Sequence, residues 1–267
     1  MYERRFEREE FGFDIDDLLA IAREAGRQIM EVYESDFAVE QKADDSPLTL
    51  ADRKAHETIQ KGLEGYGLPI LSEEGAAVPY EERKRWSRFW MVDPLDGTKE
   101  FIKKNGEFTV NIALIEDGEP VFGVVYAPAK NELYFTDSER AYKASFGESG
   151  ALEGFAPLPL SRERDEFVVV ASKSHLNDET KAYIESLQSD RPKKFLSRGS
   201  SLKLCMVAEG AADVYPRLAP TMEWDTAAAD AVVRKSGGEC LVFEALEPLR
   251  YNKENLLNPH FIVRRRG

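Results

Sequence analysis

Sulfur and imidazole ligands are scarce in this sequence. Its 267 residues include two cysteines, Cys205 and Cys240, and three histidines. A structural zinc site usually needs four ligands of these two kinds, so the small number of cysteines and histidines argues against a zinc site. We expect the two cysteines to be small buried apolar residues, which suits a reducing compartment. Any metal that the chain holds is therefore expected to be a hard cation on oxygen ligands.

Long apolar runs and an excess of positive charge are also missing. No stretch is long and apolar enough to cross a bilayer, and residues 1–10 are charged, unlike a signal peptide. A cytoplasmic protein without an integral membrane segment is expected, and peripheral contact with the inner membrane stays open. The formal net charge of −13 argues against polymeric nucleic acid as a partner, because that backbone requires a basic surface. Anions must therefore be bound locally.

The periodicity of apolar residues divides the chain into two expected subdomains. Residues 1–150 combine amphipathic helices at 14–34 and 49–63 with a mainly antiparallel sheet, which is an α+β pattern. A loop at 146–159, rich in Gly, Glu and Pro, is the expected boundary. Residues 151–267 alternate strands with helices, which is an α/β pattern. Strands are expected at 69–73, 88–93, 107–115, 120–126, 132–136, 167–171, 194–196, 212–215 and 240–243.

Four acidic residues stand at the ends of expected elements. Glu73 and Asp93 each end a strand, Asp96 lies in the turn after the second of them, and Asp225 opens a helix. Carboxylates brought together would raise one another's pKa values, and two divalent cations would neutralise their negative charge. Oxygen ligands of this kind select magnesium or manganese over zinc. Turn formation and helix capping explain each residue alone, but they do not explain the whole set.

Gly97 and Thr98 follow directly, at the start of an expected helix. Unpaired N–H groups and the positive end of the helix dipole favour an anion there, and glycine lets the backbone approach closely. The Thr98 hydroxyl could cap the helix or position a water, with Asp52 as its candidate partner. The alternative for Asp52 is an ordinary position on a helix surface. Metal ligands beside a phosphate site predict a metal-dependent phosphatase.

Three motifs, in this order, resemble those of the inositol monophosphatase-like superfamily. They are Leu71-Ser72-Glu73-Glu74, the run Val-Asp-Pro-Leu-Asp-Gly-Thr at 92–98, and Trp-Asp-Thr-Ala-Ala-Ala at 224–229. The resemblance implies a layered αβαβα sandwich of the sugar-phosphatase type. It also implies a phosphatase that uses two or three Mg²⁺ ions and is inhibited by Li⁺ or Ca²⁺.

Finer features resemble the bacterial bisphosphate nucleotidases of that superfamily. They are the runs at 96–102 and 105–113, and Gly-Ser-Ser-Leu-Lys at 199–203, whereas Leu218 stands where inositol phosphatases usually have a sugar-binding Glu. The resemblance implies removal of the 3'-phosphate of adenosine 3',5'-bisphosphate (PAP) to give AMP in sulfur assimilation, with PAPS as a further candidate substrate. The alternatives are an inositol monophosphatase or a fructose-1,6-bisphosphatase, and, from another class, a non-catalytic nucleotide-binding sensor. Monomer and homodimer both stay open.

The same resemblance assigns roles to individual residues. The implied metal ligands are Glu73, Asp93, Asp96, Asp225 and the backbone carbonyl of Leu95. Gly97 and Thr98 match the phosphate site, and Asp52, Glu73 and Thr98 match the residues that orient the attacking water. Asp225, beside the leaving oxygen, and four further residues match substrate contacts; those four are His175, Ser200, Lys203 and Arg217. Most metal ligands thus come from the first subdomain, and Glu223, Asp230 and the extension Met1–Phe13 receive no role.

Overall fold

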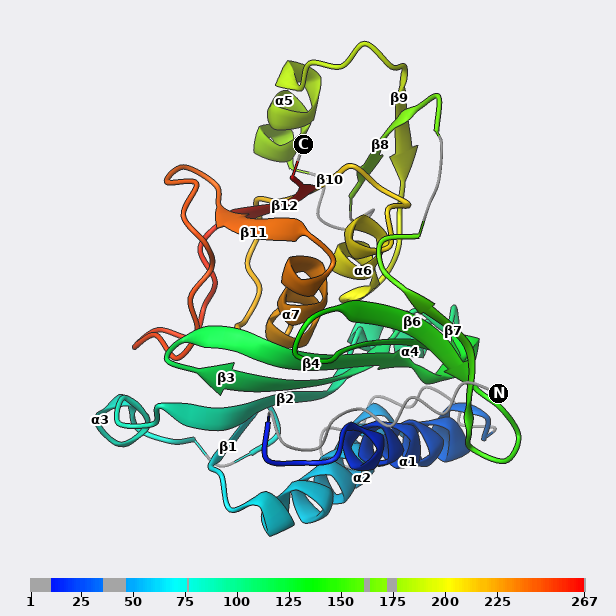
Figure 1. The fold of residues 1–267 in the computed structure, drawn as a ribbon, viewed down its shortest axis with the longest axis vertical. Coiled ribbons are helices and arrows are strands. Elements are labelled where there is room, and N and C mark those ends of the chain that lie inside the picture. The colour runs from blue at the N-terminus through cyan, green and yellow to red at the C-terminus, as the bar shows by residue number, and fades with distance from the viewer. Residues whose placement is uncertain (1–10, 36–46, 76, 161–163, 172–176, 267) are drawn as a thin grey trace.

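The computed structural model places two β-sheets and the helices that pack on them in five layers. It describes residues 11–35, 47–75, 77–160, 164–171 and 177–266. Figure 1 shows the layers in side view: α1 and α2, the first sheet, α6 and α7, the second sheet, and α5. This arrangement confirms the αβαβα sandwich. None of the helices in the described ranges has the length and hydropathy that a bilayer crossing requires.

The first sheet has seven strands in the order of the chain, β1 to β7. Strand β1 runs parallel to β2, and each later neighbour is antiparallel. A tight turn at Asp117-Gly118 connects β3 to β4 as a hairpin. The strands are β1 Ile70–Ser72, β2 Arg88–Asp96, β3 Thr109–Glu116, β4 Glu119–Ala127, β5 Glu132–Thr136, β6 Ala141–Phe146 and β7 Leu152–Pro157.

Helices α1 (Ile15–Tyr33) and α2 (Pro47–Leu63) cover one face of this sheet. The Asp14 side chain caps α1 by accepting a hydrogen bond from the Asp16 N–H. Alternate strand residues such as Trp90, Val92 and Ile112 join the apolar faces of α1 and α2 in one buried core. The residues between them, such as Met91 and Ala113, point to the opposite face and into a second core.

Helices α6 (Leu202–Ala208) and α7 (Ala227–Lys235) fill the space between the two sheets. Helix α7 crosses β4 at Gly123, where an added Cβ would lie 2.2 Å from the carbonyl oxygen of Ala228. Backbone therefore meets backbone at this crossing, and only glycine fits. The second sheet has the order β11-β12-β10-β8-β9 and carries α5 (Asp178–Ser186) on its outer face. Its strands are β8 Phe167–Val170, β9 Lys193–Leu196, β10 Val214–Arg217, β11 Gly238–Val242 and β12 Phe261–Arg265.

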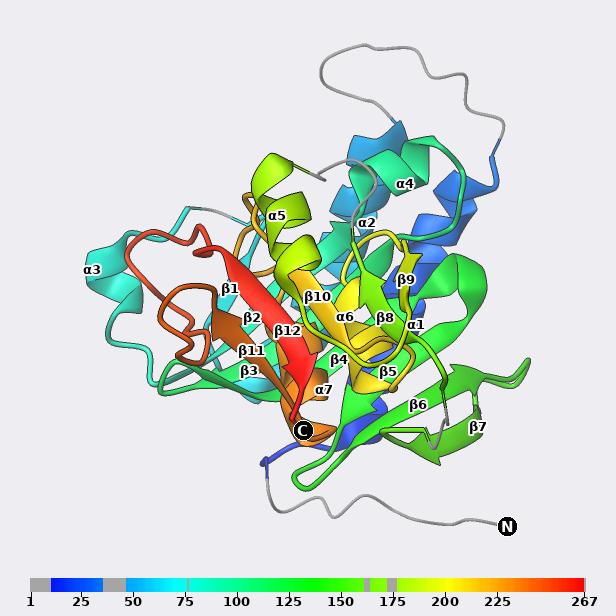
Figure 2. The ribbon, with the colours of Figure 1, turned by 90° about the horizontal axis from the view of Figure 1, so that it is seen from above.

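Short helices complete the fold, and one of them starts beside the acidic residues. Figure 2, which views the molecule from above, shows α4 near the ends of α1 and α2. Helix α4 covers Thr98–Ile102, as the sequence led us to expect, and α3 covers Tyr80–Arg83. Two 3₁₀ turns lie at Glu64–Tyr66 and Pro128–Lys130.

The sequence prediction missed three strands. The loop expected at 146–159 contains β7, an edge strand with mostly exposed side chains and no apolar alternation. The first sheet therefore continues past residue 150, the expected end of the first subdomain. The preceding strand β6 was also missed. The third missed strand is β12, near the C-terminal end of the described residues. It combines three apolar residues with two arginines, and this run is too short to predict a strand.

Candidate metal and phosphate site

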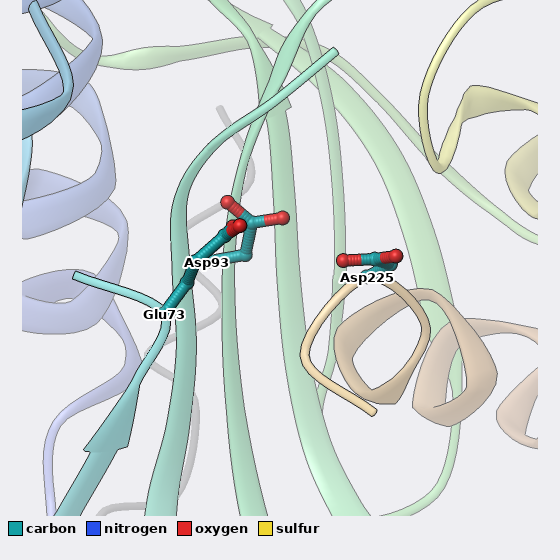
Figure 3. A group of neighbouring side chains, drawn as sticks. All are labelled: Glu73, Asp93 and Asp225. Atoms are coloured by element: carbon teal, nitrogen blue, oxygen red, sulfur yellow. The ribbon is translucent and has the colours of Figure 1, made fainter. Parts of the chain in front are cut away.

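Three of the four predicted acidic ligands come together between the sheet and α7. Glu73 directly follows β1, Asp93 lies near the end of the neighbouring β2, and Asp225 precedes α7. One carboxylate oxygen from each lies within 4.8 Å of the others. Figure 3 shows the Glu73 and Asp93 side chains side by side, facing Asp225. Parallel pairing of β1 with β2 puts the first two at the same sheet edge, since Ser72 pairs with Val92.

Asp93 is the most buried of the three, at 1% exposure. Its Oδ1 accepts a hydrogen bond from the Leu95 N–H at 3.0 Å, and its Oδ2 is buried with no partner within the described ranges. Burial raises the pKa of Asp93 well above its usual value, and Asp96, Glu73 and Asp225 raise it further. A buried carboxylate oxygen without a partner is costly. A cation at Oδ2 would remove that cost, so this donor set fits a hard metal ion.

Asp96 lies beside this cluster but outside its closest contacts. It is the last residue of β2, after a register shift that begins at Asp93, so the turn expected there is instead an irregular strand end. Asp96 Oδ2 accepts hydrogen bonds from the Ser200 hydroxyl and from the Ser201 N–H at 2.8 Å. Burial raises the pKa of Asp96, while the Ser200 hydrogen bond and the Lys203 charge oppose that rise. Leu95, between the two aspartates, is buried.

Asp225 and Asp52 also carry raised pKa values. Burial, with the Asp96 charge next in size, raises the pKa of Asp225 to about 7. The Met222 N–H, at 2.9 Å from Asp225 Oδ2, opposes that rise. Asp52, on α2, has its pKa raised to about 8 by burial and by the charges of Glu74 and Glu73. Asp52 therefore lies close to the acidic cluster, although it is far from it in sequence.

The expected hydrogen bond between Asp52 and Thr98 is not present. Asp52 Oδ1 is buried without a partner within the described ranges, and Thr98 is exposed at the start of α4. Asp52 instead lies near Glu74, which the sequence analysis left without a role. The joint role of Asp52 and Thr98 toward a water stays a prediction.

Gly97 has a backbone conformation that favours glycine. Its φ of 102° lies in the left-handed region, and an added Cβ would lie 3.1 Å from Phe108 Cα. Its carbonyl oxygen accepts the Phe101 N–H at 2.9 Å, which closes the first turn of α4. The backbone there is therefore fixed and close to the acidic residues.

A hollow of about 110 Å³ opens beside these elements. Lys203 and Arg217 bring positive charge to it, and both are largely buried, at 6% and 9% exposure. Lys203 Nζ donates to the Ser200 carbonyl at 2.6 Å, and burial together with Arg217 lowers the Lys203 pKa to about 8. Arg217 donates to the Pro220 carbonyl, while its Nε has no partner in the described part of the chain. The predicted site residues that line the hollow are Asp96, Gly97, Ser200, Lys203, Arg217 and Asp225.

Of the residues that remain, His175 was a predicted substrate contact, whereas Glu223 and Asp230 had received no role. His175 lies outside the described residues. Glu223 is fully buried and holds Asn252 and Lys253, so its role is structural. Asp230 is also fully buried and is paired with Arg234 at 2.8 Å.

Sequence reasoning missed other residues near the site. Tyr215 lines the hollow, with Lys203 Nζ 5.7 Å from its ring centroid. Thr109 and Asn111 on β3 hold the loop that contacts Asp96. The available signal was two polar residues at alternate positions of a strand whose other residues are apolar up to Ile115.

Comparison with known proteins gives consistent matches. The model of the inositol monophosphatase family matches residues 14–260. The 3'(2'),5'-bisphosphate nucleotidase CysQ of Escherichia coli (strain K12) is 44% identical over 254 residues, which cover 93% of this chain and 98% of that protein. The protein of the same name from Haemophilus influenzae is 35% identical, covering 93% and 91%. The crystal structure of CysQ from Bacteroides thetaiotaomicron, described as a bacterial member of that family, matches at a TM-score of 0.87. It is 50% identical and covers 95% of this chain and 98% of that one.

Proposed function

Because the chain belongs to the inositol monophosphatase family, we propose that it is a 3'(2'),5'-bisphosphate nucleotidase. Its substrate would be PAP, from which it removes the 3'-phosphate to give AMP and phosphate in sulfur assimilation, with PAPS as a second candidate. The observation that carries this proposal is the pair of buried cations, Lys203 and Arg217, in the hollow beside the acidic cluster. A substrate with a second phosphate explains them, and relatives of this name cover nearly the whole chain.

The acidic residues would hold two or three Mg²⁺ ions. The proposed ligands are the carboxylates of Glu73, Asp93, Asp96 and Asp225 and the carbonyl of Leu95. Bound there, the ions would lower the pKa of the attacking water and neutralise charge on the phosphate and on the leaving oxygen. The buried Asp93 Oδ2 without a partner in the described ranges supports this assignment. Inhibition by Li⁺ or Ca²⁺ belongs to the same proposal.

The remaining residues would bind and orient the substrate. The N–H groups at Gly97 and Thr98 would hold oxygens of the 3'-phosphate. Glu73, with Thr98 and Asp52, would orient the water so that it attacks phosphorus opposite the ribose oxygen. The bond from phosphorus to that oxygen then breaks, and phosphate and AMP leave. Positioning and electrostatic stabilisation account for this reaction without a covalent enzyme intermediate.

The other end of the substrate would meet the two buried cations. Arg217 can bind a phosphate with two parallel N–H groups, whereas Lys203 acts as a point charge. Ser200, on the same hollow, would contact the nucleotide as well. We propose a cytoplasmic enzyme that acts on a small nucleotide, as a monomer or a homodimer, with no polymeric nucleic acid as a partner.

A panel of phosphate esters tests this function. We expect the protein with Mg²⁺ to release phosphate from PAP with a kcat/KM at least about 100-fold above that for inositol 1-phosphate or fructose 1,6-bisphosphate. Added Li⁺ should inhibit the release. A preference for inositol phosphate or fructose bisphosphate would identify one of the rival enzymes. Tight PAP binding without phosphate release would identify a nucleotide-binding sensor.

The raised pKa values predict how stability depends on pH and on metal. Asp225 and Asp52 have pKa values of about 7 and about 8 in the folded chain, but near 4 when unfolded. At pH values between the unfolded and the folded pKa, the folded chain binds more protons than the unfolded chain. Asp225 and Asp52 therefore lower the stability of the metal-free protein as the pH rises from about 5 to about 8. Mg²⁺ binds the deprotonated carboxylates, so its stabilising effect should grow over the same interval.

Thermal unfolding measures both trends. The Tm should fall with rising pH in EDTA, and the increase in Tm caused by added Mg²⁺ should be larger at pH about 8 than at pH about 5.5. A Mg²⁺ effect that is equal at both pH values would contradict the assignment of Asp225 to the metal.

A further inference from the structure

Two buried polar side chains lie at the end of an apolar face of β3. Thr109 and Asn111 are 0% and 1% exposed. They share the face that carries Ala113 and Ile115, which belong to the core formed with α6 and α7. Buried polar groups require hydrogen-bond partners, so these two residues need a reason to be there.

Their partners are Ser200 and Ser201, in the loop between β9 and α6. Asn111 Nδ2 donates to Thr109 Oγ1 at 3.1 Å, and the Ser201 hydroxyl donates to Asn111 Oδ1 at 2.7 Å. Thr109 Oγ1 contacts the hydroxyls of both serines. The Ser200 hydroxyl and the Ser201 N–H then donate to a single oxygen, Oδ2 of Asp96. A continuous network therefore connects the inside of the first sheet to Asp96.

Counting protons gives this network a direction. An ionised Asp96 can only accept, so the Ser200 hydroxyl proton goes to its Oδ2. The Ser201 hydroxyl proton goes to Asn111 Oδ1. The Thr109 hydroxyl receives the Asn111 N–H, and its own proton is available to the Ser200 and Ser201 hydroxyls, which have both committed theirs and can accept. One branch of the network therefore runs from Asn111 through Thr109 and Ser200 to Asp96, and each hydrogen bond along it polarises the next.

We propose that Thr109, Asn111 and Ser201 are positioning residues. They hold in place the two donors to Oδ2 of Asp96, which are the Ser200 hydroxyl and the Ser201 N–H, and so leave Oδ1 for a metal ion. No hydrogen bond to Oδ1 is found within the described ranges, and Asp96 lines the hollow together with Asp225. A carboxylate with one oxygen already committed has a fixed orientation before an ion arrives, which favours binding. The inference rests on the proposed function only because that function places a cation at Asp96.

Removing the Thr109 hydroxyl tests the inference. Thr109→Val keeps the size and branching of the side chain but interrupts the donor chain. We expect calorimetric titration to show a Kd for Mg²⁺ or Mn²⁺ that is about 10-fold weaker than in the unchanged protein. The Mg²⁺ concentration for half-maximal activity should rise similarly, while KM for PAP at saturating Mg²⁺ should change by less than about 2-fold. Thr109→Ser, which restores the hydroxyl, should return the Kd to within about 2-fold.

A matched control is available on α5. Thr180 is buried at 3% exposure, and its hydroxyl donates to Asn177 Oδ1 at 2.6 Å. Thr180→Val should lower the Tm without changing the metal Kd. An unchanged Kd in Thr109→Val, or an equal weakening in Thr180→Val, would overturn the proposal.

Two further outcomes are kept separate by the design. If Thr109→Val does not fold, Ser201→Ala is tested instead. Ser201→Ala removes the side-chain hydrogen bond to Asn111 and keeps the hydrogen bond from the backbone N–H of residue 201 to Asp96. It should weaken metal binding several-fold, and an unchanged Kd would overturn the proposal. A wild-type chain that binds metal but does not hydrolyse PAP would refute the proposed function and leave the comparison of Kd values valid.

Discussion

Asp93→Asn is expected to reduce the metal-dependent phosphatase activity by about 1,000-fold or more. The amide oxygen can still accept the Leu95 N–H, so the local backbone should keep its conformation. What is lost is a charged oxygen at the position of the buried Oδ2, which has no partner in the described part of the chain. A neutral amide is a much weaker ligand for Mg²⁺ than a carboxylate. Rates of phosphate release from PAP at several Mg²⁺ concentrations measure the effect.

The same substitution should have an opposite effect on stability without metal. Replacing the Asp93 carboxylate with an amide would remove one charge from a group of carboxylates that repel one another, so the Tm in EDTA should rise. Asp230→Asn is the matched control, because Asp230 is equally buried but is paired with Arg234 and Tyr251. It should lower the Tm and leave the metal Kd unchanged. An Asp93→Asn protein that keeps a tenth or more of the activity would refute the metal assignment.

Arg217→Ala should reduce kcat/KM for PAP by about 10- to 100-fold, and much less for a phosphomonoester without a 5'-phosphate. Arg217 is 9% exposed, lines the hollow, and has a buried Nε without a partner in the described part of the chain. A hydrogen bond between charged groups in such a place contributes about 1.5–3 kcal/mol, which corresponds to the range given. Kinetics with PAP and with 3'-AMP, which lacks the 5'-phosphate, separate the two contributions.

The two substrates and the two proteins form a cycle that isolates the contact. If Arg217 binds the 5'-phosphate, the substitution should affect 3'-AMP by less than about 3-fold. Arg217→Lys should give an intermediate loss with PAP, since it keeps the charge but loses the paired N–H groups. An equal loss with both substrates would exclude a role for Arg217 at the 5'-phosphate.

The acidic residues could be located from sequence because each stands where an element starts or ends. Glu73 directly follows β1, Asp93 lies near the end of the adjacent parallel strand β2, and Asp225 lies just before α7. The sequence does not show how β2 ends, because the register shift after Asp93 depends on pairing with β3. Asp96 was therefore expected in a turn, although it is the last residue of the strand.

Contacts between distant segments were harder to predict. A hydrogen bond between Asp52 and Thr98 was expected, but the structure places Asp52 near Glu74 and leaves Thr98 exposed. Strand β7 was missed because an exposed edge strand has no apolar alternation for the sequence to reveal. Thr109 and Asn111 were considered only within an expected strand and within the run 105–113 that resembles the nucleotidases. Their hydrogen-bond partners could not be predicted, since these lie about ninety residues later.

The contact of α7 with Gly123 has a consequence for ion selection. Most helices rest on a sheet through side chains, whose rotamers can adjust the separation. Here the backbone of Ala228, close after Asp225, lies directly on β4 of the sheet that also holds Asp93. The distance between Asp225 and Asp93 therefore cannot increase easily. We expect a site of this kind to distinguish cations by radius as well as by charge, accepting Mg²⁺ and giving the larger Ca²⁺ a poorer set of ligands.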